Sequence, residues 1–273
     1  MIVTHDRDIA GAAAAAERVV SVHQRIVEFL QPGQTLAQID SFIATQLADL
    51  QCRSCFLGYK ARGHPPFPSQ ACLSVNACVV HGTHVMNRDP LAVGDILSVD
   101  IGVLHDGWIG DAAWTYAIRE ASDDALALMR CGRESLRRGV EAMRPGRPLV
   151  DFAKAVQTHV ETECGYCLVR GLGGHGYGRT LHESPFISNV VPSYPGEWEE
   201  AWQTYAPGML IAVEPMLARS TTEITSHGTA WPIFSADGSL TTHYEADVLI
   251  TAHGPRNLTQ GLFELPEIVG AAN

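Results

Sequence analysis

Four acidic side chains and one histidine interrupt the most apolar and glycine-rich segments of this 273-residue chain. Those segments read ILSVDIGVLHDGWIGDAAW, GGHGYG, GMLIAVEPM and THYEADVLIT. A buried ionised group is strongly unfavourable unless an opposite charge compensates it. The chain must therefore fold so that these groups gather around something positive, and a pair of divalent cations would serve. The five residues are Asp100, Asp111, His175, Glu214 and Glu245.

The bulk composition favours one large domain with a sizeable core. Hydrophobic residues make up 46% of the chain, and its length lies within the single-domain range, so we expect one domain over residues 1–273. No stretch reaches the roughly 18 apolar residues of a membrane helix. The charged N-terminus does not resemble a signal peptide. We expect a cytoplasmic protein, and the net charge of −11 argues against nucleic acid as a partner.

The seven cysteines are an odd number in a chain without a signal peptide, which predicts free thiols. Two C-x-x-C pairs occur, Cys52/Cys55 and Cys164/Cys167. A zinc knuckle is one interpretation of these pairs. They lie about 110 residues apart (164 − 52 = 112) without a nearby partner motif. We therefore favour the alternative that they are ordinary core or surface cysteines.

Two stretches of the chain look alike at one spacing. A Pro-Gly pair joins two helix-like segments at Pro32-Gly33 and again at Pro145-Gly146, an offset of 113 (145 − 32). Glu214 follows Asp100 at an offset of 114 (214 − 100), each six residues after a glycine. Chance similarity is the alternative to a true repeat. A repeat predicts two α+β halves related by an approximate two-fold axis, about 10–120 and 121–255, each giving a strand carboxylate to one centre.

The periodicity of apolar residues gives a coarse map of the elements. Helical patterns predict helices over 7–31, 35–50, 122–143 and 148–164. Runs of β-branched and aliphatic residues predict strands over 71–80, 96–104, 108–119, 166–172, 209–217 and 243–251. Segments rich in Pro, Gly and aromatic residues predict loops over 56–70 and 184–205.

Asp100 and Asp111 are eleven residues apart (111 − 100), and the sequence HDG lies between them. Such a turn between two apolar runs predicts a β-hairpin. Two antiparallel strands would bring both carboxylates to one face. A lone Asp more often caps a turn or faces solvent, but the Val-Asp-Ile and Ile-Gly-Asp contexts favour burial here.

The other three residues extend the same set. Glycines on both sides of His175 allow the backbone and a cation to approach closely. The alternative is that His175 is a polar residue hydrogen-bonded within the protein, which is the commoner role of a lone histidine. A buried Glu without a partner becomes neutral or costs several kcal/mol, so Glu214 and Glu245 need a partner. An oxygen-rich set with one imidazole suits Mn, Fe, Co or Zn and differs from a closed structural zinc site.

The segments SVNACVVHG, SVDIG, GDAAW, GHGYGRTLHESP, MLIAVEPM and HYEADVLIT, in this order, resemble type I methionine aminopeptidases. The similarity runs from about residue 10 to 255. It implies an α+β pita-bread fold, with two pseudo-symmetric halves, a central curved antiparallel sheet and helices on its outer face. It also implies that the five residues bind two divalent metal ions, with Asp111 and Glu245 bridging both.

The resemblance further implies roles in the hydrolysis of N-terminal methionine from peptides and nascent proteins by a monomeric enzyme. His81 matches the family's histidine near the scissile nitrogen, and His182 matches the one that stabilises the carbonyl oxygen. Glu214 is expected to act as general base and proton shuttle. The expected methionine pocket comprises side chains that could equally be plain core: Phe56, Tyr59, Phe67, Cys72, Leu181 and Trp231, with His81 and His182 beside them.

Several positions depart from the family's pattern. Phe56 stands where a small residue or Cys is usual, Leu181 where Phe is frequent, and Ala246 where His is common. The stretch KARGHPPFP is longer than the usual loop, and HGTHVMN replaces the usual HGIP continuation. None of these changes affects a candidate metal ligand. They predict a divergent paralogue with an altered pocket or with lower activity on standard nascent chains.

Three hypotheses follow. The first is a metal-dependent aminopeptidase that removes N-terminal Met. The second is another pita-bread hydrolase, such as an Xaa-Pro peptidase or a creatinase-like enzyme, which usually has an additional N-terminal domain. The third is a binding module that has kept the fold without catalysis. Such modules usually lose metal ligands, whereas all five candidates are present here.

Overall fold

Two five-stranded sheets form the centre of the molecule in the computed structural model, which describes residues 1–270. The first has the order β1-β4-β5-β16, with β2 added on β4, and the second has the order β15-β14-β9-β7-β8. Their pairs are antiparallel except β16 with β5. The first sheet comprises β1 (Arg53–Ser54), β2 (Cys72–Val75), β4 (Ile96–His105), β5 (Trp108–Ile118) and β16 (Ile268–Val269). The second comprises β7 (Gly173–Gly176), β8 (Glu183–Ser188), β9 (Leu210–Val213), β14 (Ala246–Thr251) and β15 (Gly254–Asn257).

The two large sheets meet where β5 runs beside the start of β14. The amide of Glu245 donates a hydrogen bond to the carbonyl oxygen of Ala113 at 2.9 Å. The amide of Asp111 donates to the carboxylate of Asp247 at 2.8 Å. The amides of two candidate ligands, Asp111 and Glu245, therefore donate hydrogen bonds that connect the N-terminal and C-terminal parts of the chain.

Two three-stranded sheets complete the fold, in the orders β13-β10-β6 and β11-β12-β3. The second joins the halves again, because β3 pairs with β12. This pairing holds the segment before His81 against the segment after Trp231. The strands are β3 (Cys78–Val80), β6 (Cys167–Leu168), β10 (Met216–Ala218), β11 (Ile224–Ser226), β12 (Ile233–Ser235) and β13 (Thr241–His243).

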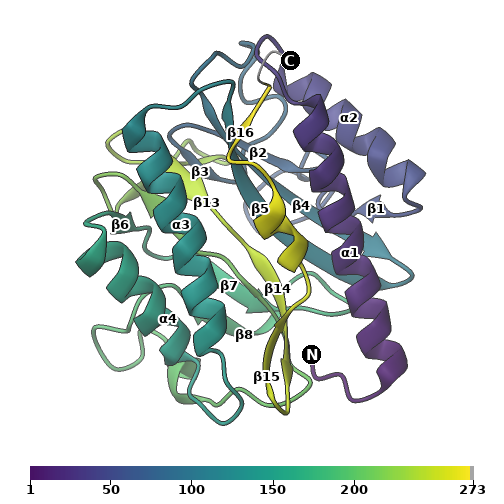
Figure 1. The fold of residues 1–273 in the computed structure, drawn as a ribbon, viewed down its shortest axis with the longest axis vertical. Coiled ribbons are helices and arrows are strands. Elements are labelled where there is room, and N and C mark those ends of the chain that lie inside the picture. Colours follow the sequence, from purple (N-terminus) through teal and green to yellow (C-terminus); the bar gives the residue numbers. More distant parts are fainter. Residues whose placement is uncertain (271–273) are drawn as a thin grey trace.

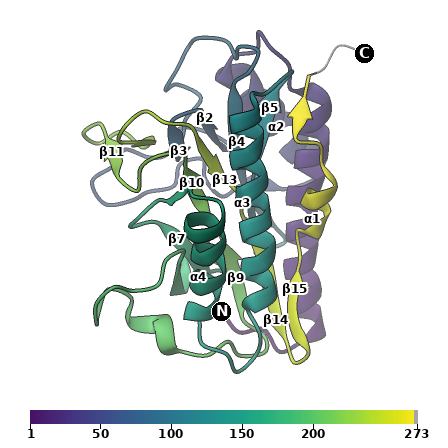
Figure 2. The same cartoon turned by 60° about the vertical axis from the view of Figure 1, so that its left-hand side comes forward.

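The long helices cover one side of the strands (Figures 1 and 2). They are α1 (Asp6–Phe29), α2 (Leu36–Asp49), α3 (Asp123–Ala142) and α4 (Val150–Gln157), and α4 continues as a π-helical segment, Thr158–Glu163. Short 3₁₀ helices span Glu199–Trp202 and Gln260–Glu264. Helix α1 lies close to β5 because Gly110 has no side chain: a Cβ there would be 2.6 Å from the Ala15 backbone. In residues 1–270, no helix combines the length and the apolar character needed to cross a membrane.

The helices confirm the sequence predictions to within a few residues, whereas several strand predictions were wrong in part. The predicted strands 71–80, 209–217 and 243–251 are each divided in two. The first breaks at Asn76, whose φ of +53° forms a turn, and the second breaks at Glu214-Pro215, where proline has no amide to donate to a ladder.

The region around residues 166–205 differs most from the predictions. Only Cys167–Leu168 is extended within the predicted strand 166–172. The predicted loop 184–205 begins with most of β8, which was missed because Pro185 argues against a strand. Proline is tolerated there because β8 is the edge of its sheet. The predicted loop 56–70 is confirmed. The repeat, with its halves 10–120 and 121–255, and the single domain stay predictions, and residues 271–273 lie outside the described part.

Candidate active site

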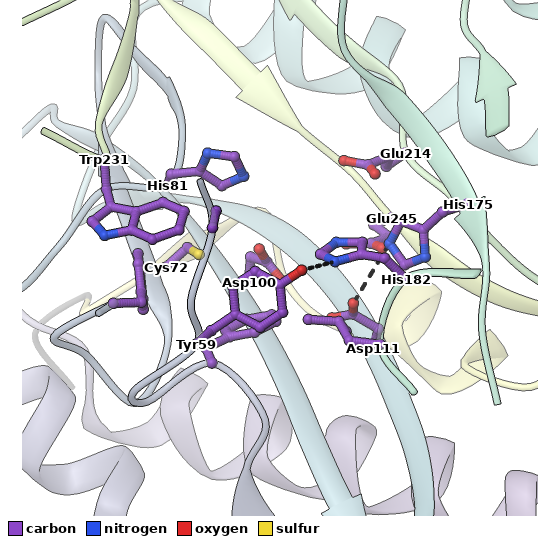
Figure 3. Close-up of a pocket in the computed structure, with 14 residues that line it drawn as sticks. Tyr59, Cys72, His81, Asp100, Asp111, His175, His182, Glu214, Trp231 and Glu245 are labelled. Carbon is purple, nitrogen blue, oxygen red and sulfur yellow. Dashed lines mark hydrogen bonds and ion pairs between the residues drawn. The ribbon is translucent and has the colours of Figure 1, made fainter. Parts of the chain in front are cut away.

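One cavity, of about 250 Å³, brings together the side chains selected from the sequence (Figure 3). Its polar wall comprises Asp100, Asp111, His175, Glu214 and Glu245. Its apolar wall comprises Phe56, Tyr59, Phe67, Cys72, Leu181 and Trp231. His81 and His182 also line it, and Ala61 is the one further lining residue. Pockets for drug-sized ligands usually measure roughly 300–1,000 Å³, so this space suits a single side chain and its peptide group.

The hairpin β4–β5 supplies the two aspartates, as predicted. Asp100 pairs with Ala113, and Gly102 pairs with Asp111, so the two carboxylates are diagonal neighbours on one face. The opposite face of β5 packs on α1. Gly102 leaves room above the aspartates, because a Cβ there would be 2.3 Å from Cys55 Sγ. The loop after Cys55 can therefore close over the site.

Glu214 and Glu245 occupy breaks between strands rather than strand interiors, which corrects the sequence interpretation. Glu214 lies between β9 and β10, and Glu245 lies between β13 and β14. At such a break the backbone makes no regular hydrogen bonds of a β-ladder, so hydrogen bonds from other groups fix its position. The Asn189 side-chain amide donates to the carbonyl oxygen of Glu214 at 3.0 Å. The main-chain bond from Glu245 to Ala113 fixes the second carboxylate.

His175, on β7, has the orientation of a metal ligand. Its Nδ1 lies 3.1 Å from the carbonyl oxygen of Gly176, and its Nε2 lies 3.9 Å from Asp111 Oδ2. Donation from Nδ1–H to the carbonyl leaves the Nε2 lone pair facing the carboxylates. The flanking glycines serve close strand packing: a Cβ on Gly174 would lie 2.2 Å from the carbonyl oxygen of Ala212.

The buried carboxylates of the polar wall repel one another when they are ionised. Burial raises the pKa of Asp100 to about 6. Burial, together with the charge of Asp100, raises the pKa of Asp111 well above its ordinary value. Burial and the charge of Asp111 do the same for Glu245. One oxygen each of Asp100 and Asp111 is buried without a hydrogen-bond partner. These oxygens fit a divalent cation, which accepts several carboxylate ligands and removes the charge repulsion.

Two residues of the site were missed in the sequence. His243 is 2% exposed, and its Nε2 lies 3.2 Å from Glu214 Oε2 and 3.8 Å from Glu245 Oε2. Asp247 is fully buried and accepts the Asp111 amide. Both lie two residues from Glu245 in THYEADVLIT, so the alternation of ionisable and apolar residues in that segment could have found them.

Among residues 1–270, two overlapping groups of donors at this cavity could hold cations, and of their members only His243 lies behind the lining residues. One comprises Asp111, His175 and Glu245, and the other comprises Glu214, His243 and Glu245. Glu245 belongs to both groups, whereas Asp111, the other carboxylate expected to bridge, belongs to one. Asp100 lines the same cavity but belongs to neither group.

Aromatic side chains and a histidine face the polar wall from loops. Tyr59 Oη lies 2.8 Å from His182 Nδ1. Trp231 Nε1 donates to the carbonyl oxygen of Pro65 at 2.8 Å, which ties its segment to the loop 56–70. The Phe67 and Trp231 rings pack edge to face with centroids 5.3 Å apart. The apolar wall is thus built mainly from the loop 56–70 and the segment around Trp231, with Cys72 added from β2 and Leu181 from the segment before β8.

The catalytic candidates also include two histidines, His81 and His182, whose pKa values lie below the ordinary range. Burial lowers the pKa of His81 to about 4, and burial together with the charge of the nearby His175 lowers the pKa of His182 to about 4. Such imidazoles are neutral near pH 7. His81 has a left-handed backbone, with φ of +57°, which is uncommon for a residue other than glycine. Such backbone strain is frequent at functional sites.

The fold and the site define a class of protein. Residues 10–252 match the model of metallopeptidase family M24, and the chain belongs to this family. The methionine aminopeptidase 1 of Mycobacterium tuberculosis is 37% identical over 256 residues, covering 92% of each chain.

Solved structures agree with this assignment. The crystal structure of methionine aminopeptidase from Rickettsia prowazekii superposes with a TM-score of 0.86 and 28% identity, covering 95% of this chain and 100% of that one. The prolidase from Pyrococcus furiosus has a TM-score of 0.72 and 19% identity, covering 94% of this chain and 65% of that one. The latter is a similarity of fold. The expected α+β pita-bread fold is confirmed.

Proposed function

We propose that this protein hydrolyses the N-terminal methionine from peptides and nascent proteins, with two divalent cations in the cavity. The observation that carries the proposal is the arrangement of one cavity with a buried, oxygen-rich wall facing an apolar wall of the size of one side chain. Identity of 37% to a methionine aminopeptidase over most of both chains supports the same activity.

The residues that would hold the cations are Asp100, Asp111, His175, Glu214 and Glu245. Their buried, unpaired oxygens support this assignment. Bound Co, Mn, Fe or Zn would polarise the scissile carbonyl and lower the pKa of a water molecule, so that hydroxide is available near neutral pH.

The protein's own groups then move protons and orient the peptide. Glu214 lies at the cavity with its side chain 14% exposed, where it can accept the proton of the attacking water and pass it to the leaving amine. His243, 3.2 Å away, can orient that carboxylate. His81 lines the cavity opposite Glu214 and is assigned to the scissile nitrogen (Figure 3).

His182 is assigned to the carbonyl oxygen of the scissile peptide. If Tyr59 donates its O–H to Nδ1 across 2.8 Å, the proton of the neutral imidazole resides on Nε2. That N–H can donate to the oxygen on which negative charge develops in the transition state. Tyr59 therefore positions His182 in addition to lining the pocket.

The apolar wall is assigned to the methionine side chain, because a flexible, polarisable thioether packs well among aromatic rings. Phe56 and Leu181, two departures from the family's pattern, both line this wall. Ala246, the third, is buried at the start of β14. We infer that this protein has a side-chain preference of its own at the first residue.

A direct comparison of substrates tests the proposal. The protein loaded with Mn or Co should release free Met from Met-Ala-Ser and leave Xaa-Pro peptides intact. Preferential cleavage of the Xaa-Pro peptides would contradict it and favour the second hypothesis. A cytoplasmic location, a monomeric state and the lack of a nucleic-acid partner remain predictions.

A further inference from the structure

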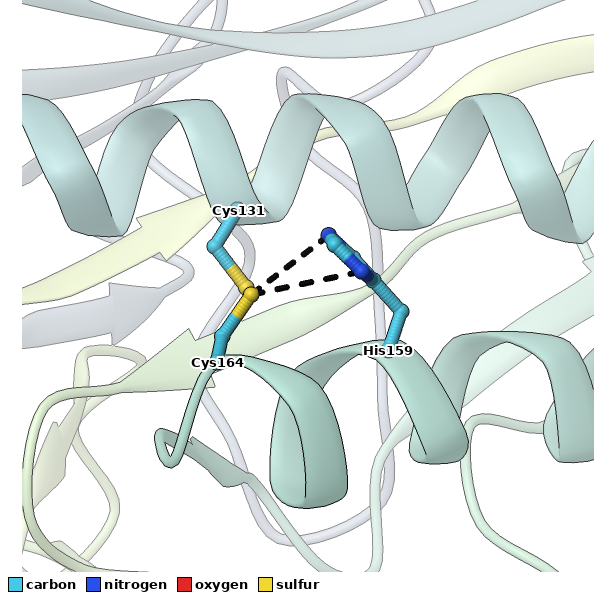
Figure 4. Close-up of side chains that lie close together, drawn as sticks. All are labelled: Cys131, His159 and Cys164. Carbon is cyan, nitrogen blue, oxygen red and sulfur yellow. Dashed lines mark hydrogen bonds between the residues drawn. The ribbon is translucent and has the colours of Figure 1, made fainter.

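A second group of metal-binding side chains lies on the helical side of the molecule, outside the catalytic cavity. Cys131 belongs to α3, His159 to the π-helical segment, and Cys164 ends that segment (Figure 4). One donor atom from each lies within 4.8 Å of the others. Cys164 Sγ is 3.6 Å from His159 Nε2. None of these residues has a part in the proposed aminopeptidase reaction.

The π-helical turn explains how two of these ligands meet. In an α-helix with 3.6 residues per turn, residues five apart point about 140° away from each other. Here the amide of Cys164 donates to the carbonyl oxygen of His159 at 3.0 Å, the hydrogen bond of a π-turn. This wider turn brings the imidazole and the thiol to the same side, facing Cys131. Such turns are rare and frequently occur at functional sites.

The imidazole is oriented as in known zinc sites. Glu163 Oε2 lies 3.0 Å from His159 Nδ1 and accepts a hydrogen bond from Nδ1–H in the tautomer whose Nε2 lone pair faces the thiols. Arg138 holds this carboxylate in turn, with Nη1 2.7 Å from Glu163 Oε2. Metal-binding histidines almost always donate their second nitrogen to a carboxylate or carbonyl in this way.

Burial and access also suit a cation. Cys131 is 4% exposed and His159 is 7% exposed, whereas Cys164 is exposed at the rim. A cation can therefore enter from solvent beside Cys164, and a water molecule or other small ligand can complete a tetrahedral shell. The partner Cys167 of the C-x-x-C pair lies on β6 and is not in the group, so this is not the zinc knuckle considered from the sequence.

We propose that Cys131, His159 and Cys164 form a zinc site that fastens α3 to the end of the α4 extension. Two thiolates and one imidazole are a donor set that Zn²⁺ prefers. On binding, each thiol releases its proton to solvent, and the two thiolate charges neutralise the cation. The catalytic cavity supplies mainly oxygen ligands, so the two kinds of site differ in their chemistry.

Cobalt is a probe that separates them, because Co²⁺ bound to thiolate gives an intense near-ultraviolet sulfur-to-metal charge-transfer band. The full-length reduced protein is titrated with Co²⁺ alone, as wild type and as the variants Cys164→Ser and Cys167→Ser. We expect the band in wild type and in Cys167→Ser and its loss in Cys164→Ser. Metal analysis after zinc loading should show one fewer equivalent in Cys164→Ser than in Cys167→Ser.

Aminopeptidase activity and circular dichroism should be unchanged in both variants, which keeps a folding defect distinct from loss of the site. A second variant, Glu163→Gln, should weaken zinc binding by about 10-fold or more without removing the band. Absence of the band in wild type, or its persistence in Cys164→Ser, would overturn the proposal. So would a mass lower by two hydrogens after purification in air with no zinc bound, which would indicate a Cys131–Cys164 disulfide instead.

Discussion

The two walls of the catalytic cavity are built in different ways. The carboxylates come from central strands and their junctions, where main-chain hydrogen bonds such as Glu245 to Ala113 fix them. The apolar side chains come mainly from the loop 56–70 and the segment around Trp231, which are joined through the Trp231–Pro65 hydrogen bond. We therefore expect the reaction to depend on groups held by the sheets, and the accepted side chain to depend mainly on the loops. Changes in the two walls should therefore have different kinetic effects.

Asp111→Asn should have the largest effect, because it removes a buried charge from the centre of the polar wall. We expect loss of detectable peptidase activity and weaker metal binding, measured by peptide hydrolysis and by calorimetric titration with Mn²⁺. Asp106→Asn is a matched control in the exposed turn of the same hairpin, where asparagine tolerates the φ of +48°. Equal loss in both variants would argue for damage to the hairpin instead.

His182→Ala should lower kcat by roughly 10²–10³-fold with a smaller change in KM, as for loss of one oxyanion donor. The exposed His227→Ala should behave like wild type in the same steady-state assay. A near-wild-type kcat in His182→Ala would contradict the role of this histidine.

Tyr59→Phe should lower kcat less, by about 5–10-fold, because it removes one orienting hydrogen bond.

Trp231→Phe tests the apolar wall. It keeps an aromatic ring but removes the hydrogen bond to Pro65. We expect KM for Met-Ala-Ser to rise by about 10-fold, with kcat nearly unchanged, since a pocket contact discriminates by roughly 10–200-fold. The preference between Met and other unbranched side chains should change as well. A fall in kcat equal to that of His182→Ala would show that the two walls are not separable.

The pH dependence of stability should distinguish the polar wall with and without metal. Burial raises the pKa of Asp100 to about 6, above its value in the unfolded chain. Such a group stabilises the fold while protonated, and this contribution is lost as the pH rises through about 6. The melting temperature of chelator-treated protein should therefore decrease relative to that of metal-loaded protein mainly between about pH 4 and pH 6, the interval between the unfolded and folded pKa values of Asp100. A constant difference would contradict the assignment, and Asp100→Asn should reduce the widening.

Much of the site could be predicted because its signals are local. An aspartate within an apolar run on each side of a turn predicted the β4–β5 hairpin, and the periodicity of apolar residues predicted the helices. Asp247 was missed because its role depends on the amide of Asp111, 136 residues away in the chain. The zinc group was missed for a similar reason: it needs a π-turn and a contact with α3, and neither has a sequence pattern of its own.

Strand ends were the least predictable part of the fold. The sequence around Glu214 is mostly apolar, and that around Glu245 alternates ionisable and apolar residues. Neither pattern marks the point where the chain leaves one sheet and enters another, which occurs at each carboxylate. Where a strand changes sheets depends on contacts with distant strands, such as β6 and β13 on β10. The short strands β11, β12 and β16 are likewise fixed by their partners more than by their own residues.

The proposed removal of N-terminal methionine is tested by the release of amino acids from Met-Ala-Ser by the purified protein. After treatment with chelator and reloading with Mn, Fe, Co or Zn, we predict free Met and intact Ala-Ser, and no release before reloading. The absence of free Met with all four metals, or cleavage of the bond between Ala and Ser in the intact tripeptide, would contradict the account.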